Sequence, residues 1–180
     1  SGVLQYVSIR HGGFVITGNK ELNGLSMGAL GNGTTIDHVE CYAIADDGFE
    51  FFGGTVNTKY LVSAFNDDDA FDTDQGYRGK NQFWFAIQEN GKRDNGGEWN
   101  GEPSGIAVSN APYANFQVYN ATWIGGGTVS GAATNSNNGL FIREYSAPRV
   151  YNSVLTDFNP TGGTLGCRMD ANSGKMLTNG

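Results

Sequence analysis

The acidic pentapeptide Asp46-Asp47-Gly48-Phe49-Glu50 returns as Asp68-Asp69-Ala70-Phe71-Asp72, twenty-two residues further along the chain. A weaker third copy occupies residues 94–98 and follows after twenty-six more residues. A fixed period of roughly 20 to 30 residues is the signature of a solenoid, in which each repeat packs against its neighbours. This repeat therefore constrains the fold more than any other feature of the sequence.

A short β-rich run precedes each acidic or polar turn, at residues 35–41, 59–65 and 82–87. Strand, turn, strand and turn within about 22 residues make one coil of a parallel β-helix, whose coils stack about 4.8 Å apart. The second half repeats more loosely: 105–108 and 118–120 correspond to 139–142 and 150–152. We predict a right-handed parallel β-helix with longer turns in its C-terminal half. It forms a single domain over residues 1–180 that is part of a longer chain or assembly.

Composition agrees with an all-β fold, since the chain has 28 glycines and only four prolines among 180 residues. Such a composition favours many short strands joined by tight turns. An antiparallel β-sandwich or jelly roll would use the same composition. That alternative does not predict the same acidic turn at single-coil intervals, so the parallel β-helix is the preferred fold class.

Side chains alternate between the two faces of a strand, which divides each predicted coil into inward and outward positions. Glu50 and Asp72 are predicted to point outward from equivalent places in successive coils. Cys41 and Cys167 lie several coils apart, so each is expected to be a buried small hydrophobe and not half of a disulfide. The residues predicted to point inward are Phe49, Phe51, Phe71, Phe83, Phe85 and Ile87.

The formal net charge of -7 argues against nucleic acid or an anionic membrane surface as a partner, because both need clustered Lys and Arg. No apolar run approaches the roughly 18 residues that a membrane span needs. A cation or a neutral glycan is the better expectation for a partner.

The runs 45–57 and 66–77, together with the opening segment 6–13, resemble a group of largely uncharacterised bacterial secreted and cell-surface proteins. The resemblance covers roughly the first hundred residues well and the remainder weakly. Proteins of this group are similar in fold to the pectate-lyase-like right-handed β-helices. The resemblance implies a fold and an extracellular or cell-surface location, and it brings no established activity.

Carboxylates stacked at one-coil spacing repel each other by about 3 kcal/mol at 5 Å and an effective dielectric near 20, so something must compensate them. An oxygen-only set of this kind suits Ca²⁺, whereas Zn²⁺ would need nearby His or Cys. Two alternatives stay open: the Asp side chains bond to local turn backbone, or they form a solvated acidic face. The candidate calcium ligands are Asp46, Asp47, Glu50, Asp68, Asp69, Asp72, Asp94 and Glu98, with Asp74 as a further acceptor.

The resemblance to the pectate-lyase-like superfamily implies a catalytic alternative, in which Ca²⁺ holds a uronate and a basic side chain removes the sugar C5 proton. Lys80 and Arg78 follow the second acidic turn and are the candidate bases. Their structural alternative is simple pairing with Asp72 and Asp74. The two histidines are too few for a catalytic triad, and glycoside hydrolysis would need a carboxyl separation that the sequence does not give.

Trp84 is predicted to face outward between inward-facing Phe83 and Phe85, and Trp99 lies at the third acidic turn. Both are candidate platforms for sugar rings. The leading hypothesis is an extracellular calcium-stabilised β-helix module that binds or is presented at a cell surface, with polysaccharide as a possible contact. The alternatives are a calcium-dependent polysaccharide lyase and a subunit that associates end to end in an extracellular filament.

Overall fold

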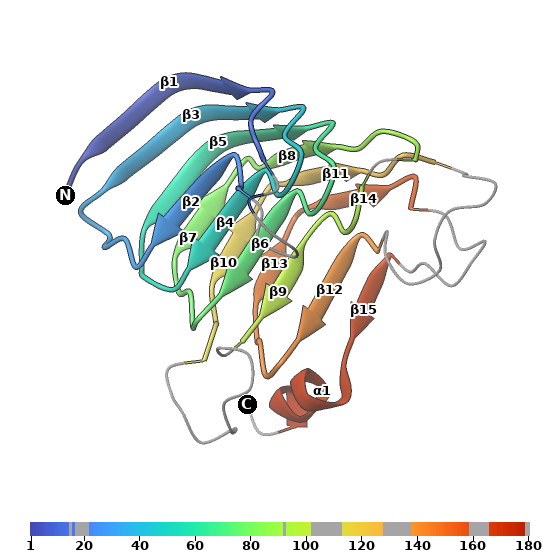
Figure 1. Cartoon of the computed structure of the whole chain (residues 1–180). Coiled ribbons are helices and arrows are strands. Elements are labelled where there is room, and N and C mark those ends of the chain that lie inside the picture. The colour runs from blue at the N-terminus through green and yellow to red at the C-terminus, as the bar shows by residue number, and fades with distance from the viewer. Residues whose placement is uncertain are drawn as a thin grey trace.

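The computed structural model describes residues 1–14, 16, 22–91, 93–101, 113–127, 138–158 and 166–178. Within these ranges the chain forms short strands and a single helix (Figure 1). The elements are β1 (Val3–Arg10), β2 (Leu25–Gly28), β3 (Thr35–Tyr42), β4 (Phe49–Phe52), β5 (Asn57–Ala64), β6 (Phe71–Asp74), β7 (Lys80–Gln82), β8 (Phe85–Ile87), β9 (Glu98–Asn100), β10 (Gln117–Tyr119), β11 (Thr122–Ile124), β12 (Leu140–Arg143), β13 (Arg149–Tyr151), β14 (Val154–Thr156), β15 (Cys167–Met169) and α1 (Ala171–Thr178).

Two parallel sheets wrap around a common core, and the chain passes from one sheet to the other in every coil (Figure 1). The six-stranded sheet has the order β15-β12-β9-β6-β4-β2. The nine-stranded sheet begins with the long strands β1, β3 and β5, and each later coil contributes two short strands to it. Every strand pair in the described ranges is parallel, so the predicted β-helix is confirmed and the antiparallel alternative is wrong.

Strand register confirms the repeat that the sequence shows. Phe49 pairs with Phe71 and Glu50 with Asp72, which is the twenty-two-residue offset. Asp72 pairs in turn with Glu98 in the next coil. In the second half Val118 pairs with Val150, as predicted. The segment 139–142 continues the coil of 96–99, and its predicted counterpart 105–108 lies outside the described residues.

A column of left-handed residues bends the nine-stranded sheet at one corner of every coil. Its members lie in register, and their φ values are 56° at Tyr6, 51° at His38, 53° at Tyr60, 57° at Phe83, 56° at Asn120 and 46° at Asn152. The four rings of this column stack along the helix axis, with centroid separations of 4.7, 4.4 and 4.9 Å. Because a non-glycine residue with positive φ is strained, these stacked rings help to stabilise the corner.

Aromatic rings fill the space between the two sheets. Phe49 stacks on Phe71 at 5.3 Å, and Phe71 stacks on Trp84 at 4.3 Å. Trp99 packs edge-on against Phe116 further along the axis. Phe49, Phe51 and Phe71 are fully buried, so their predicted inward orientation is confirmed.

The left-handed corner reverses the predicted orientation of the 82–87 segment. Phe83, predicted to point inward, is 37% exposed, whereas Trp84, predicted to point outward, is 1% exposed. Phe85 and Ile87 are only half-buried, and the inward residue between them is Ala86. Since the residue at the corner points outward like the one before it, simple alternation along the strand fails from Phe83 onward.

The two cysteines differ in environment. Cys41 is completely buried, as predicted, but Cys167 on β15 is exposed, so the prediction for Cys167 is wrong. Both thiols are free. No helix in the described part of the chain is long and apolar enough to cross a membrane.

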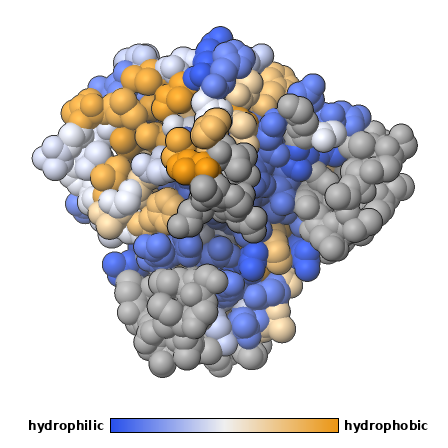
Figure 2. All heavy atoms as spheres, viewed as in Figure 1, coloured by the Kyte–Doolittle hydropathy of each residue, from blue (hydrophilic) through white to orange (hydrophobic). Residues whose placement is uncertain are grey.

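Apolar side chains are exposed around the first coil. Figure 2 shows apolar residues gathered over the part of the molecule that β1 to β3 occupy in Figure 1. Val3, Phe14, Ile16 and Leu22 are all at least half exposed. The predictions of a longer chain and of end-to-end association stay predictions, and this surface is where they should be tested.

Candidate functional site

Asp and Asn side chains occupy one equivalent position in consecutive coils, in the turn before each strand of the six-stranded sheet. We call this set of residues the ladder. Its members precede a glycine or alanine in consecutive coils, and they are Asn23, Asp47, Asp69, Asn95 and Asn138. The Oδ1 atom of Asp47 accepts the backbone N–H of Asp69 at 2.9 Å. Asp69 Oδ1 accepts both the backbone and the side-chain N–H of Asn95, at 2.5 and 2.9 Å. The turn-chemistry alternative therefore accounts for one oxygen of each of these two aspartates.

Carboxylates also gather in space along this ladder. Three groups have oxygen atoms within 4.8 Å of one another: Asp46, Asp47 and Asp68; Asp47, Glu50 and Asp72; and Asp68, Asp69 and Asp94. These groups contain seven of the eight predicted calcium ligands, and no His or Cys belongs to them. The strand register brings them together, because equivalent positions in neighbouring coils lie one coil spacing apart.

Burial disfavours the ionised form of the carboxylates in these three groups, which together we call the carboxylate cluster. Burial and then neighbouring carboxylates raise the pKa values of Asp47, Asp69 and Asp72 well above the usual range of aspartate. Burial likewise raises the pKa of Glu50 to about 7, although a hydrogen bond from Asn23 opposes the shift. Near neutral pH the cluster therefore favours binding a proton or a cation.

Asp72 presents an oxygen with no hydrogen-bond partner in the described part of the chain. Its Oδ1 atom is buried and accepts no hydrogen bond from the described residues. Its neighbours in register are Glu50 and Glu98, which are themselves acceptors when ionised. An unpaired buried carboxylate oxygen is expensive, so this position fits a bound cation better than the turn-chemistry alternative does.

Arg143 is the basic residue that the sequence analysis missed. It lies on β12, and its guanidinium pairs with Glu98 at 2.7 Å and with Glu144 at 3.4 Å. Its charge also opposes the burial that raises the pKa of Asp74. The pairing of β12 with β9 places Arg143 beside Asn100, and sequence spacing alone gave no sign of this register because a long turn separates the two strands.

The predicted bases Lys80 and Arg78 are exposed and lie elsewhere. Lys80 begins β7 in the nine-stranded sheet, whereas the carboxylate cluster borders the six-stranded sheet. Lys80 shares a groove of about 650 Å³ with Lys59, Asn57 and Tyr119. Among the described residues no ion pair joins Arg78 or Lys80 to Asp72 or Asp74. The structure therefore separates the predicted bases from the predicted metal ligands.

The two tryptophans cannot serve as sugar platforms. Trp84 is 1% exposed and Trp99 is fully buried, so the prediction of a substrate-binding role is wrong for both. The Nε1 atom of Trp84 donates to Thr58 Oγ1 at 2.8 Å, and that of Trp99 donates to the carbonyl oxygen of Phe71 at 3.2 Å. For Trp99 simple alternation is the reason, because Glu98 before it points outward.

Comparison with known proteins gives one match. The family described as "Pectate-lyase like beta helix domain" matches residues 1–178. No curated protein and no solved structure matches the chain. The family match covers nearly the whole chain and agrees with the parallel coils and the stacked interior. This chain belongs to the family of pectate-lyase-like β-helix domains.

Proposed function

We propose that this chain is a calcium-binding β-helix domain of an extracellular or cell-surface protein, in which the ion ties adjacent coils together. The observation that carries the proposal is the Oδ1 of Asp72, which is buried in the group formed with Asp47 and Glu50 and accepts no hydrogen bond from any residue that the structure describes. Ca²⁺ takes six to eight oxygen ligands, and carboxylates with water can supply them. The ion would replace repulsion between coils with attraction.

The chemistry of the cluster favours a hard cation. Its three overlapping groups offer only carboxylate oxygens, which suit Ca²⁺ and do not suit Zn²⁺. Asp47 belongs to two of the groups, so more than one ion position is available along the ladder. The raised pKa values of Asp47 and Asp69 have the same origin, since a proton and a cation relieve the same repulsion.

Binding is a better proposal than catalysis at this cluster. A lyase needs a base within hydrogen-bond reach of the sugar proton, but Lys80 begins β7 in the nine-stranded sheet and Arg78 lies in the turn between β6 and β7. Arg143 lies at the cluster but is held by Glu98 and Glu144. We therefore propose an ion-stabilised module and not a polysaccharide lyase.

The test is thermal unfolding with Ca²⁺ titrated against a chelator. An ion held by the native state at 100 times its Kd adds about 2.7 kcal/mol, which raises the Tm of a chain this size by about 5–10 °C. Asp72→Asn should remove most of that shift. Asp157→Asn, at an exposed position outside the three carboxylate groups, is the matched control and should keep the shift. Equal Tm values in Ca²⁺ and chelator would refute the calcium site.

We further propose that the groove around Lys80 contacts an acidic polysaccharide. The two ammonium groups of Lys59 and Lys80 outnumber the one carboxylate of its lining, that of Asp37, and amide and hydroxyl groups such as those of Asn57 and Thr34 lie beside them. Such groups bond to the hydroxyls and carboxylates of uronate sugars. Lys80 would then bind the polymer instead of acting as a base.

The double change Lys59→Gln with Lys80→Gln should weaken binding of oligogalacturonate about tenfold, since each exposed ion pair contributes up to about 1 kcal/mol. Isothermal titration at low ionic strength measures the effect. Arg149→Gln on β13, outside the groove lining, is the control. Unchanged affinity in the double variant would remove the groove from the proposal.

A further inference from the structure

The first and the last coil of the described chain have the same backbone shape. β1 has eight residues, and strand register makes residues 149–156 of β13 and β14 their equivalents. A left-handed residue occupies the fourth place in both, with φ values of 56° at Tyr6 and 46° at Asn152. A second one follows both directly, with 52° at His11 and 60° at Asp157. The two coils therefore bend at the same two corners.

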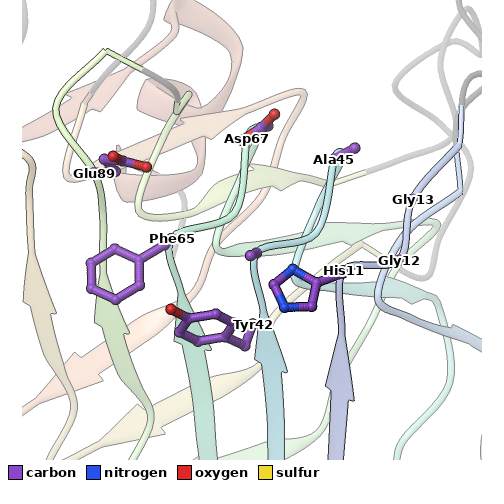
Figure 3. Close-up of a pocket in the computed structure, with 9 residues that line it drawn as sticks. His11, Gly12, Gly13, Tyr42, Ala45, Phe65, Asp67 and Glu89 are labelled. Carbon is purple, nitrogen blue, oxygen red and sulfur yellow. The ribbon is translucent and has the colours of Figure 1, made fainter.

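The second corner lies where the long strands end. Figure 3 shows His11 and Phe65 there, with the Tyr42 ring between them. Tyr42 meets both rings edge-on, at 5.8 and 5.7 Å between centroids. Ala43, in the coil between, has the same left-handed backbone, with a φ of 51°. The backbone N–H of His11 donates to the Tyr42 carbonyl at 3.0 Å, so this corner continues the hydrogen bonding between coils.

Both ends of the described stack present strand edges that pair on one side only. β1 and β2 form one end, and β13, β14 and β15 form the other (Figure 1). In the last coil the backbone N–H of Val154 donates to the carbonyl of Ala121 in the coil before it, at 2.9 Å. Ser8 is the equivalent of Val154 in the first coil, so its N–H faces the place of a preceding coil. Such an edge is a template for another strand.

The interior also ends in uncovered apolar side chains. Met169 on β15 lies in the same inward row as Met27 on β2, but it is 39% exposed whereas Met27 is 2% exposed. Cys167, in register with buried Leu140, is exposed and has a free thiol. The helix α1 packs against β12, the strand before β15 in the sheet. A further coil would bury both sulfur-containing side chains of β15.

We propose that the partner at this surface is a second copy of the chain, whose first coil docks on the last coil of the first copy. Matching corners let the strands pair in parallel across the junction, as they do within the chain. The junction would also bring the imidazole of His11 beside the carboxylate of Asp157. A contact between two first coils fits less well, because antiparallel pairing about the centre of β1 sets Tyr6 opposite Val7 and separates the corners.

A head-to-tail contact repeats without closing, so it builds a linear assembly. Each copy contributes one strand per coil to the six-stranded sheet, and six coils advance by about 29 Å. The proposal does not depend on the calcium site or on the Lys80 groove, since neither lies at the junction.

The test is sedimentation velocity from roughly 1 to 100 μM protein, the range of modest protein–protein affinities, with a thiol reagent as a second readout. We expect species that grow with concentration. Modification of Cys167 should slow at least about tenfold on assembly, because a thiol must be accessible to react. Cys41 is completely buried and should stay silent. A monomer at every concentration, with constant thiol reactivity, would overturn the proposal.

Variants block one end at a time. Met169→Lys places a charge on the last coil, and Ser8→Pro removes an outward N–H from the exposed edge of β1. Each should be monomeric alone, whereas their equimolar mixture should form a dimer and stop, because one free end of each kind remains. Val154→Lys, whose side chain is 55% exposed and points sideways from the last coil, is the control and should assemble like the parent chain.

The unfolding curve of each variant, followed by circular dichroism, shows whether it is folded. Assembly of either end-blocked variant alone would refute the head-to-tail contact, and so would a mixture that stays monomeric. A contact between two first coils would instead survive in Met169→Lys and be lost in Ser8→Pro.

Discussion

Trp84→Ala is expected to lower the free energy of unfolding by about 4 kcal/mol. The indole is 1% exposed, stacks on Phe71 at 4.3 Å and packs against Phe51 at 5.5 Å. Its loss leaves a cavity in the aromatic core and removes the hydrogen bond to Thr58. The Tm should fall by about 8–16 °C in thermal unfolding followed by circular dichroism.

Phe83→Ala is the matched control, because the two aromatic residues are neighbours in the chain and differ in burial. Phe83 is 37% exposed and stacks on Tyr60 in the outer column, so a loss of about 1 kcal/mol is expected. The in-and-out pattern of a regular strand gives the opposite order. A larger loss for Phe83→Ala than for Trp84→Ala would therefore contradict the left-handed corner at this coil.

Asp69→Asn is expected to stabilise the chelator-treated protein by about 1–3 kcal/mol at pH 7, because it removes a buried charge that faces other carboxylates. Asn95 and Asn138 occupy the same ladder position in the next coils, so an asparagine there keeps the hydrogen bonds. The same variant should lose most of its stabilisation by Ca²⁺. Paired Tm measurements in chelator and in Ca²⁺ give both results. A variant that is destabilised in chelator would show that the charge itself is needed for folding.

The stability of the protein in chelator is expected to change with pH in one direction. Burial raises the folded-state pKa of Glu50 to about 7 and raises those of Asp47 and Asp72 above their unfolded values. The native state therefore binds more protons than the unfolded state between about pH 4.5 and 7, so stability in chelator rises as the pH falls through this window. Saturating Ca²⁺ should flatten the rise, because the ion competes with the protons. Stability in chelator that instead falls from pH 7 to pH 5 would contradict the raised pKa values.

The candidate site was partly predictable from the sequence. The repeated acidic turn placed Glu50, Asp72 and Glu98 in one column, and strand register confirms that column. The ladder positions of Asn23 and Asn138 were missed, because neither has an acidic residue one position before it or three positions after it, as Asp47 and Asp69 do. Arg143 was missed because its contact with Glu98 crosses a long turn of unpredictable length.

Sequence alone determined the fold class. Twenty-two residues make one coil of two strands and two turns, and stacked parallel coils place the repeated acidic turns next to each other. The sequence also determined that one side of the β-helix is acidic, because the side chains of a regular repeat reappear at the same place in every coil. Tertiary structure decided which aromatic residues are buried, because the left-handed corners shift the alternation by one residue and no local pattern marks them. It also decided that Lys80 lies apart from the carboxylates, since the fold of each coil, and not distance along the chain, assigns a residue to a sheet.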